Sequence, residues 1–253
     1  MASFIQPPNQ INMRLKRPFR IAIYVVVITA LLVAVMITRV KLNAYLADAD
    51  NDYYYHLNVF TDADFGYKSI RSHKDANHNG IDDTMDFVYA ARKVAKTHPY
   101  YRDAYYDGGY PPDDEGVCTD MIWRSFQLVG IDFKELIDED IASNTEAYAR
   151  IEDKPHPNID FRRVPNIATF LERNAEACTL DLSKKQDWQA GDFIIFRDSH
   201  IAIVSDYRDE DGYPYLIHHA DNKQEHLEED VLVALNERKP ISAHYRWDFS
   251  QSS

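Results

Sequence analysis

Cys118 is the residue of this chain best suited to covalent chemistry. It follows Gly116 and Val117 and opens a stretch whose apolar spacing predicts a helix over 118–129. The positive end of a helix lowers the pKa of a thiol placed there, and the thiolate is the reactive form of cysteine. We therefore expect Cys118 to be a nucleophile. The alternative is an inert buried thiol, which is common for free cysteines.

Two histidines occupy positions suited to a base and its orienting partner. His200 stands at the head of the apolar run 201–204, and His218 ends the next run, 215–217. A cysteine on a helix, a histidine on one strand and a polar group on the neighbouring strand is the catalytic arrangement of papain-like hydrolases. His219 is the fallback for the orienting group, because adjacent strand residues point to opposite faces.

A zinc site is the rival use of Cys118, His200 and His218, since three such ligands suit a catalytic metal. The chain has neither a CxxC nor an HExxH motif, so the sequence favours the nucleophile. Cys178 lacks a comparable setting, and we expect it in the core.

Several motifs in order resemble an uncharacterised bacterial family of the NlpC-like, papain-fold cysteine hydrolase clan. They run from about Ala90 to Trp247 and comprise GVCTDMIWR, NIDFRRVPN, GD, SHIAIVSD and a closing HYR. The resemblance implies that Cys118 is the nucleophile, His200 the base and His218 the orienting group. It also implies an amide substrate, with a peptide bond of the peptidoglycan stem as the leading choice. The family usually has His-Asn where this chain has His218 and His219, so the chain differs from the family next to the expected orienting group.

Further residues are candidates for contacting the substrate: Asp120, Tyr110, Arg162, Arg163 and His219. Asp120 can instead cap the expected helix. The two arginines can bind a substrate carboxylate or pair with carboxylates of an acidic domain. Tyr110 precedes the cysteine closely enough to line a cleft.

Residues 75–86, DANHNGIDDTMD, have the spacing of a calcium-binding loop and resemble the calcium loops of thrombospondin type 3 and dockerin repeats. Such a loop carries oxygen ligands on alternate residues, a glycine where the backbone turns (here Gly80) and a late carboxylate. The expected ligands are Asp75, Asn77, Asn79, Ile81, Asp83 and Asp86. An Asp replaces the usual Glu at the twelfth position. The alternative is a solvated turn that caps the following helix.

An uncharged apolar segment, residues 21–38, lies between Arg20 and Arg39. As a helix with a rise of about 1.5 Å per residue it reaches about 27 Å, enough for the hydrocarbon core of a bilayer. Four basic residues precede it and two follow, which predicts a cytoplasmic N-terminus and an extracytoplasmic body. We expect an uncleaved single-pass anchor in the cell membrane. Cleavage of a signal peptide near residues 47–49 is the alternative.

The remainder of the chain is acidic, with 22 basic against 41 acidic residues after position 41, which argues against a nucleic-acid partner. Helical spacing over 84–96, 118–129 and 167–174 precedes β-type runs at 193–196, 201–204 and 215–217. This order predicts an α+β domain with N-terminal helices packed on a small antiparallel sheet. The expected layout is a basic tail (1–20), a transmembrane helix (21–38), a stalk (39–74), the calcium-like loop (75–86) and a papain-like hydrolase domain (87–250).

These features predict a membrane-anchored extracytoplasmic cysteine hydrolase that cleaves an amide bond of the cell wall. Calcium is expected in a structural role, and no organic cofactor is expected. Two alternatives stay open. The same fold can serve as a catalytically idle module that binds wall peptides and calcium, or it can transfer the acyl group to an amine instead of water.

Overall fold

The structure is a computed structural model that describes residues 26, 28, 29, 31 and 33 and the ranges 59–148 and 154–251. The chain divides into two units, Met1–Leu57 and Asn58–Ser253. The five residues described in the first unit are helical and exposed. The expected basic tail, most of the expected membrane helix and the first part of the stalk therefore lie outside the described residues. Among the residues that are described, no helix has the length and apolar character needed to cross a membrane.

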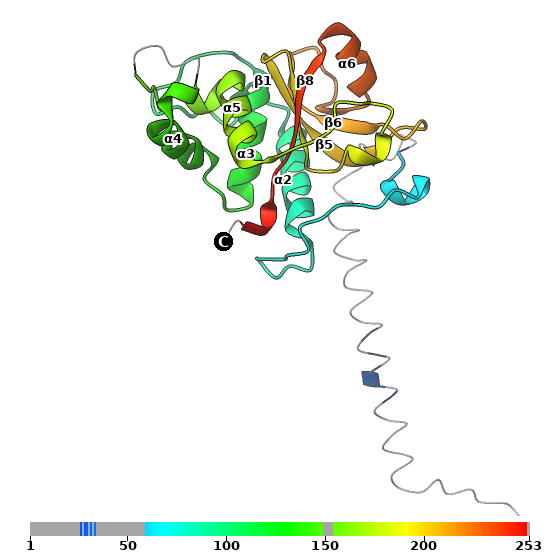
Figure 1. The fold of residues 1–253 in the computed structure, drawn as a ribbon. Helices are drawn as coiled ribbons and strands as arrows, with labels where there is room; N and C mark the ends of the chain where they lie inside the picture. Colours follow the sequence, from blue (N-terminus) through cyan, green and yellow to red (C-terminus); the bar gives the residue numbers. More distant parts are fainter. Residues whose placement is uncertain are drawn as a thin grey trace, which may run out of the picture. The chain divides into compact units, whose positions relative to one another are not determined.

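Helices make up much of the first half of the second unit (Figure 1). They are α2 (Asp83–Thr97), α3 (Cys118–Leu128), α4 (Phe133–Ser143) and α5 (Val164–Asn174), and α6 (Leu232–Arg238) lies near the end of the chain. α2 begins where the Asp82 carboxylate accepts a hydrogen bond from the Thr84 amide at 3.0 Å. Such a bond satisfies one of the unpaired amides at a helix start. α2 and α3 pack against each other.

A six-stranded antiparallel sheet forms the second half. Its strands are β3 (Glu176–Ala177), β4 (Phe193–Phe196), β5 (His200–Arg208), β6 (Pro214–Ile217), β7 (Glu228–Glu229) and β8 (Ile241–Arg246), in the spatial order β3-β8-β4-β5-β6-β7. β4, β5 and β6 form a meander, and β8 returns to pair with β4. A two-residue parallel pair joins β1 (Tyr100–Tyr101) to β2 (Glu115–Gly116) directly before α3.

Both faces of the sheet are buried, because side chains alternate along each strand and each face has a cover. One face joins α2 and α3 in the larger core through Phe193, Ile195, Ile201, Ile203 and Ile217. The other face packs with Trp188 and with Leu232 of α6 in a smaller core through Ile194, Phe196, Ala202, Val204 and Leu216. This double burial explains why the strands read as continuous apolar runs in the sequence.

Two buried arginines join other segments to the sheet. Arg92 of α2 donates its Nε hydrogen to Glu228 of β7 at 2.8 Å. Arg208 of β5 pairs with Asp62 at 2.5 Å, and its backbone pairs with that of Phe60. The end of the segment predicted to be a stalk, from residue 59 onward, therefore packs on the sheet.

The mixed α+β architecture predicted from the sequence is confirmed. The predicted helices correspond to α2, α3 and α5, and the predicted strands to β4, β5 and β6, with ends that differ by a few residues. α4 and α6 were not predicted from the sequence. In α4 the buried residues Phe133, Ile137 and Ile141 recur every fourth position, a spacing that does predict a helix. α6 has seven residues and is too short for a clear period.

Candidate active site

Cys118 is the first residue of α3, and the turn before it is fixed by Asp120. The Asp120 carboxylate accepts a hydrogen bond from the Val117 amide at 2.8 Å and so caps the helix. Gly116 lies against this cap, because a Cβ at position 116 would be 3.1 Å from the Cβ of Asp120 and 3.2 Å from Arg124 Nη1. A larger residue there would displace the cap, which accounts for the glycine two positions before the cysteine.

Arg162, a candidate substrate contact, pairs with Asp120 inside the protein. Its Nε donates to Asp120 Oδ1 at 2.7 Å, and its Nη2 donates to Oδ2 at 2.8 Å. The indole of Trp123 also donates to Asp120, at 2.7 Å. The GVCTD and DFRR motifs therefore meet in one buried ion pair that supports the cysteine. Arg163, the neighbouring candidate, pairs with Asp160 at 3.3 Å, and 38% of its side chain is exposed.

His200 and His218 lie side by side in the sheet. His200 is the first residue of β5, and His218 directly follows β6, the next strand. His200 Nε2 lies 2.9 Å from His218 Nδ1, and the two rings are nearly perpendicular. In the described structure, Nδ1 of His200 has no hydrogen-bond partner. Burial lowers the pKa of His200, and burial also lowers the pKa of His218 to about 4, so both rings are neutral near pH 7.

The Cys118 thiol lies beside the start of β5. Burial raises the pKa of this thiol to about 11, and a hydrogen bond from the Ile201 backbone opposes the rise. Ile201 directly follows His200, and Lys239 is a charged neighbour of both the thiol and the His200 ring. The thiol and the His200 ring make no hydrogen bond with each other in the described structure. The expected lowering of the thiol pKa is therefore absent here, because desolvation outweighs the helix end.

The candidate catalytic groups are closed off from solvent. The exposed fraction is 6% for Cys118, 5% for His200 and 4% for His218. Near them, Tyr101 stands edge-on to His219, with ring centroids 5.1 Å apart. Burial raises the pKa of Tyr101 to about 12, and an electrostatic interaction with Cys118 adds to the rise. Tyr101 is thus an electrostatic neighbour of the thiol. It could not be predicted from the sequence, since no spacing distinguishes it among 17 tyrosines.

His219 and Tyr110 do not take part in the hydrogen bond between His200 and His218. His219 is 1% exposed, and neither of its ring nitrogens has a hydrogen-bond partner among the described residues. Tyr110 packs edge-on against Trp123, with ring centroids 4.8 Å apart, and against Phe161 at 5.4 Å. The structure therefore places Tyr110 in an aromatic cluster and places His218, rather than His219, against His200.

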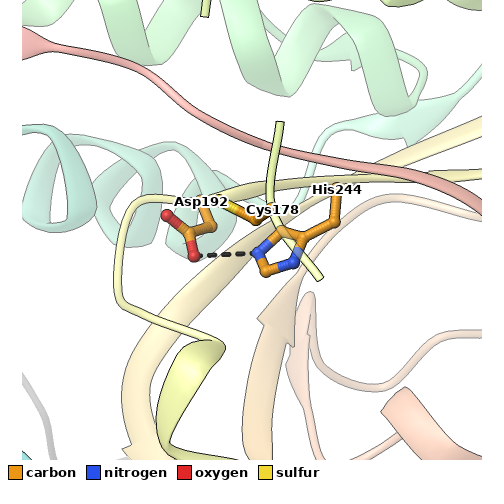
Figure 2. A group of neighbouring side chains, drawn as sticks. All are labelled: Cys178, Asp192 and His244. Atoms are coloured by element: carbon orange, nitrogen blue, oxygen red, sulfur yellow. Dashed lines mark hydrogen bonds and ion pairs between the residues drawn. The ribbon is translucent and has the colours of Figure 1, made fainter. Parts of the chain in front are cut away.

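A second group of polar side chains lies elsewhere in the sheet (Figure 2). The ligand atoms of Cys178, Asp192 and His244 lie within 4.8 Å of one another, and no other group of three His, Cys, Asp or Glu residues in the described part of the chain meets that test. In the described residues, the side chains of Cys118, His200 and His218 therefore do not lie close enough together to bind one zinc ion.

In this second group, the atoms of Asp192 and His244 that could bind a metal already make hydrogen bonds within the protein. Arg246 donates to both carboxylate oxygens of Asp192, at 2.8 and 2.7 Å, and His244 Nε2 lies 2.8 Å from the same carboxylate. His244 Nδ1 lies 2.8 Å from the Thr179 carbonyl oxygen. These contacts do not fit a metal centre, because a guanidinium already neutralises the carboxylate. They show instead that the GD and HYR motifs form one ion-pair network between β4 and β8.

In the calcium-like loop, several candidate ligands contact one another. The amide of Asn77 donates to Asp86 at 2.7 Å, and the amide of Asn79 donates to the same carboxylate at 2.9 Å. The Asp75 carboxylate accepts the backbone amides of Asn79 and Gly80, at 3.0 and 2.8 Å. One oxygen of Asp83, Oδ2, is buried and has no hydrogen-bond partner in the part of the chain that the structure describes. The loop thus gathers oxygen-bearing side chains around its turn.

Comparison with known proteins places these features in a family. Residues 88–247 match the family described as "Domain of unknown function (DUF1287)", and the chain belongs to this family. It is similar to "Uncharacterized protein YijF" of Escherichia coli (strain K12), with 37% identity over 156 residues that cover 59% of this chain and 72% of that protein. No solved structure matches the chain. The matched range contains Cys118, His200 and His218, whereas the calcium-like loop lies before it.

Proposed function

We propose that this protein is a cysteine hydrolase of the NlpC-like papain fold, with Cys118 as nucleophile, His200 as base and His218 as the orienting group. The observation that carries the proposal is the 2.9 Å contact between His200 Nε2 and His218 Nδ1, next to the residue whose backbone hydrogen-bonds the thiol of Cys118. A base whose far nitrogen is held by a polar neighbour is the arrangement that activates a nucleophile in such hydrolases.

In the proposed mechanism, Nδ1 of His200 takes the proton of the Cys118 thiol as the sulfur attacks an amide carbonyl carbon. The Cys118 backbone amide, at the start of α3, helps to stabilise the negative oxygen of the tetrahedral intermediate. The intermediate collapses to a thioester, and His200 delivers its proton to the departing amine. Water, deprotonated by His200, then hydrolyses the thioester and restores the thiol. Because both histidines are neutral near pH 7, His200 is in the form that accepts a proton.

The substrate we propose is a peptide bond in the peptidoglycan stem, reached from the extracytoplasmic side of the cell membrane. The order of the GVCTD, GD, SHIAIV and HYR motifs supports this substrate by its resemblance to the NlpC-like clan. The basic N-terminus followed by an apolar segment supports the location.

The proposal is tested by amine release from purified peptidoglycan. We expect full-length protein in detergent to release new amino groups, and Cys118→Ala to lose at least 1,000-fold in rate. Cys178→Ala is the matched control and should keep its activity, because Cys178 lies in the other polar group. Hydrolysis undiminished in Cys118→Ala would contradict the proposal. An added amine that becomes joined to the product would indicate acyl transfer.

We also propose that the 75–86 loop binds calcium in a structural role. Asp75, Asp83 and Asp86 supply carboxylates, and Asn77 and Asn79 supply amide oxygens once their amides turn toward the cation. We expect millimolar calcium to raise the melting temperature by a few degrees, and Asp86→Asn to abolish that rise. Asp113→Asn, in an exposed turn, should leave the rise intact. An equal calcium response in Asp86→Asn would exclude this site.

A binding module without catalysis is the second candidate, and the thiol environment favours it. A thiol whose pKa is about 11, in a site with 6% exposure, is not a reactive group in this state. If this candidate holds, the protein binds peptidoglycan fragments and Cys118→Ala binds them equally, with no amine released by either.

A further inference from the structure

Glu229 of β7 lies behind the pair of histidines. In the sheet Glu229 pairs with Leu216, which precedes His218 by two residues, so the carboxylate is on the same face as the His218 ring. Glu229 Oε1 lies 3.9 Å from His218 Nε2, the nitrogen that does not contact His200. His200 at the start of β5, His218 directly after β6 and Glu229 of β7 thus form a series across three neighbouring strands.

We propose that Glu229 is a positioning residue that keeps the hydrogen of His218 on Nε2. This inference rests on the proposed function and adds a fourth group to it. Glu229 does not touch the reacting atoms and acts through His218.

The location of that hydrogen decides whether His200 can act as a base. A neutral imidazole carries one hydrogen, so its two nitrogens are one donor and one acceptor. If His218 carries its hydrogen on Nε2, its Nδ1 accepts a hydrogen bond from His200 Nε2–H across the 2.9 Å contact. His200 Nδ1 then has a free electron pair that can take the thiol proton, leaving the sulfur its electrons. The opposite arrangement puts a hydrogen on His200 Nδ1 and blocks that transfer.

Gln224 is the competing influence on His218. Its amide nitrogen lies 3.4 Å from His218 Nε2 and 2.5 Å from Glu229 Oε1. Its amide oxygen accepts the Ala220 backbone amide, which fixes the orientation of the group. An amide hydrogen directed at His218 would favour a lone pair on Nε2. We infer that the carboxylate prevails, because the amide is directed to Glu229 by its shorter contact and an ionised partner interacts more strongly than a neutral one.

Other charged groups surround this series. Burial raises the pKa of Glu229, Gln224 and Arg238 oppose the rise, and Asp221 adds to it. His218 is next to His219 and Asp221 in addition to His200. No other carboxylate in the described residues lies within 4 Å of a nitrogen of His218. Glu229 is therefore the group whose removal should change the hydrogen position.

The inference is tested by ¹⁵N NMR of full-length protein labelled at histidine, in detergent micelles at pH 7. His200→Gln and His218→Gln identify the two rings. We expect both rings to carry hydrogen on Nε2 in the unaltered protein, and both to shift toward Nδ1 in Glu229→Gln. Glu229→Asp should restore the original pattern in part. Glu237→Gln, an exposed position on α6, removes the same charge and should change neither ring.

Identical hydrogen positions in Glu229→Gln and the unaltered protein would overturn the inference, as would Nδ1–H on His218 before any substitution. These readouts need no enzymatic activity, so they hold even if no hydrolysis is found and the proposed function fails. Where hydrolysis does occur, kcat should fall at least tenfold in Glu229→Gln with KM little changed. If hydrolysis depends on Cys118 but kcat is unchanged in Glu229→Gln, Glu229 does not position His218 for catalysis, and the proposed function is unaffected.

Discussion

At the scale of single residues, the candidate nucleophile is a protonated thiol held in a closed site. Two effects act on Cys118 in opposite directions. The helix start and the Ile201 backbone favour the thiolate, whereas burial disfavours it and prevails. The resting forms are thus a neutral thiol and a neutral imidazole, and in the proposed mechanism the proton moves only as the sulfur attacks.

Alkylation of Cys118 as a function of pH tests that resting state. With a thiol pKa of about 11, roughly 1 in 10,000 molecules carries the thiolate at pH 7. We expect the rate with iodoacetamide to rise about tenfold per pH unit from 7 to 10, measured by mass spectrometry in a Cys178→Ser background. A rate that levels off near neutral pH would show that the thiolate is already formed.

At the scale of structural elements, the Asp120–Arg162 ion pair joins the start of α3 to the short turn before α5. Both side chains are nearly inaccessible, and Asp120 also caps the helix that bears Cys118. Removing one partner of a buried pair leaves an uncompensated charge, whereas an exposed pair contributes little.

We expect Asp120→Asn to lower the free energy of unfolding by about 3–5 kcal/mol, because Arg162 remains buried without its counter-charge. Urea denaturation measures the change. Arg102→Gln is the contrasting control, since its pair with Glu115 lies at the surface, and it should alter unfolding far less. Similar losses in both variants would mean that burial is not what makes the Asp120 pair important.

The sequence predicted the elements better than the contacts between them. Apolar runs located β4, β5 and β6, and the motif order identified His200 and His218 as neighbours on adjacent strands. The pairing of Asp120 with Arg162 was not predictable, because it depends on how two distant segments pack. Tyr101 and Glu229 were missed for the same reason, since neither stands in a local pattern that indicates chemistry.

At the scale of the whole molecule, protonation of His218 links the candidate site to the stability of the fold. His218 has a folded-state pKa of about 4, below its ordinary value of about 6.5. Between these two pH values the unfolded chain binds a proton that the folded chain does not. Stability therefore rises with pH across this window and is lost as pH falls from 6.5 toward 4.

We expect the melting temperature to fall as pH is lowered from 6.5 to 4, and His218→Gln to reduce that fall. The expected contribution of His218 over this window is up to about 3 kcal/mol. His73→Gln is the control, since His73 is exposed and precedes the calcium-like loop. An acid dependence unchanged in His218→Gln would show that His218 takes up a proton equally well in the folded state.

The covalent role of Cys118 is tested most directly by trapping the acyl-enzyme. Full-length protein is mixed with purified peptidoglycan fragments, quenched in acid within seconds, digested and mapped by mass spectrometry. We expect a peptidyl adduct on the fragment that contains Cys118, absent in Cys118→Ala and retained in Cys178→Ala. Hydrolysis that proceeds with no adduct, and at the same rate in Cys118→Ala, would contradict this covalent role.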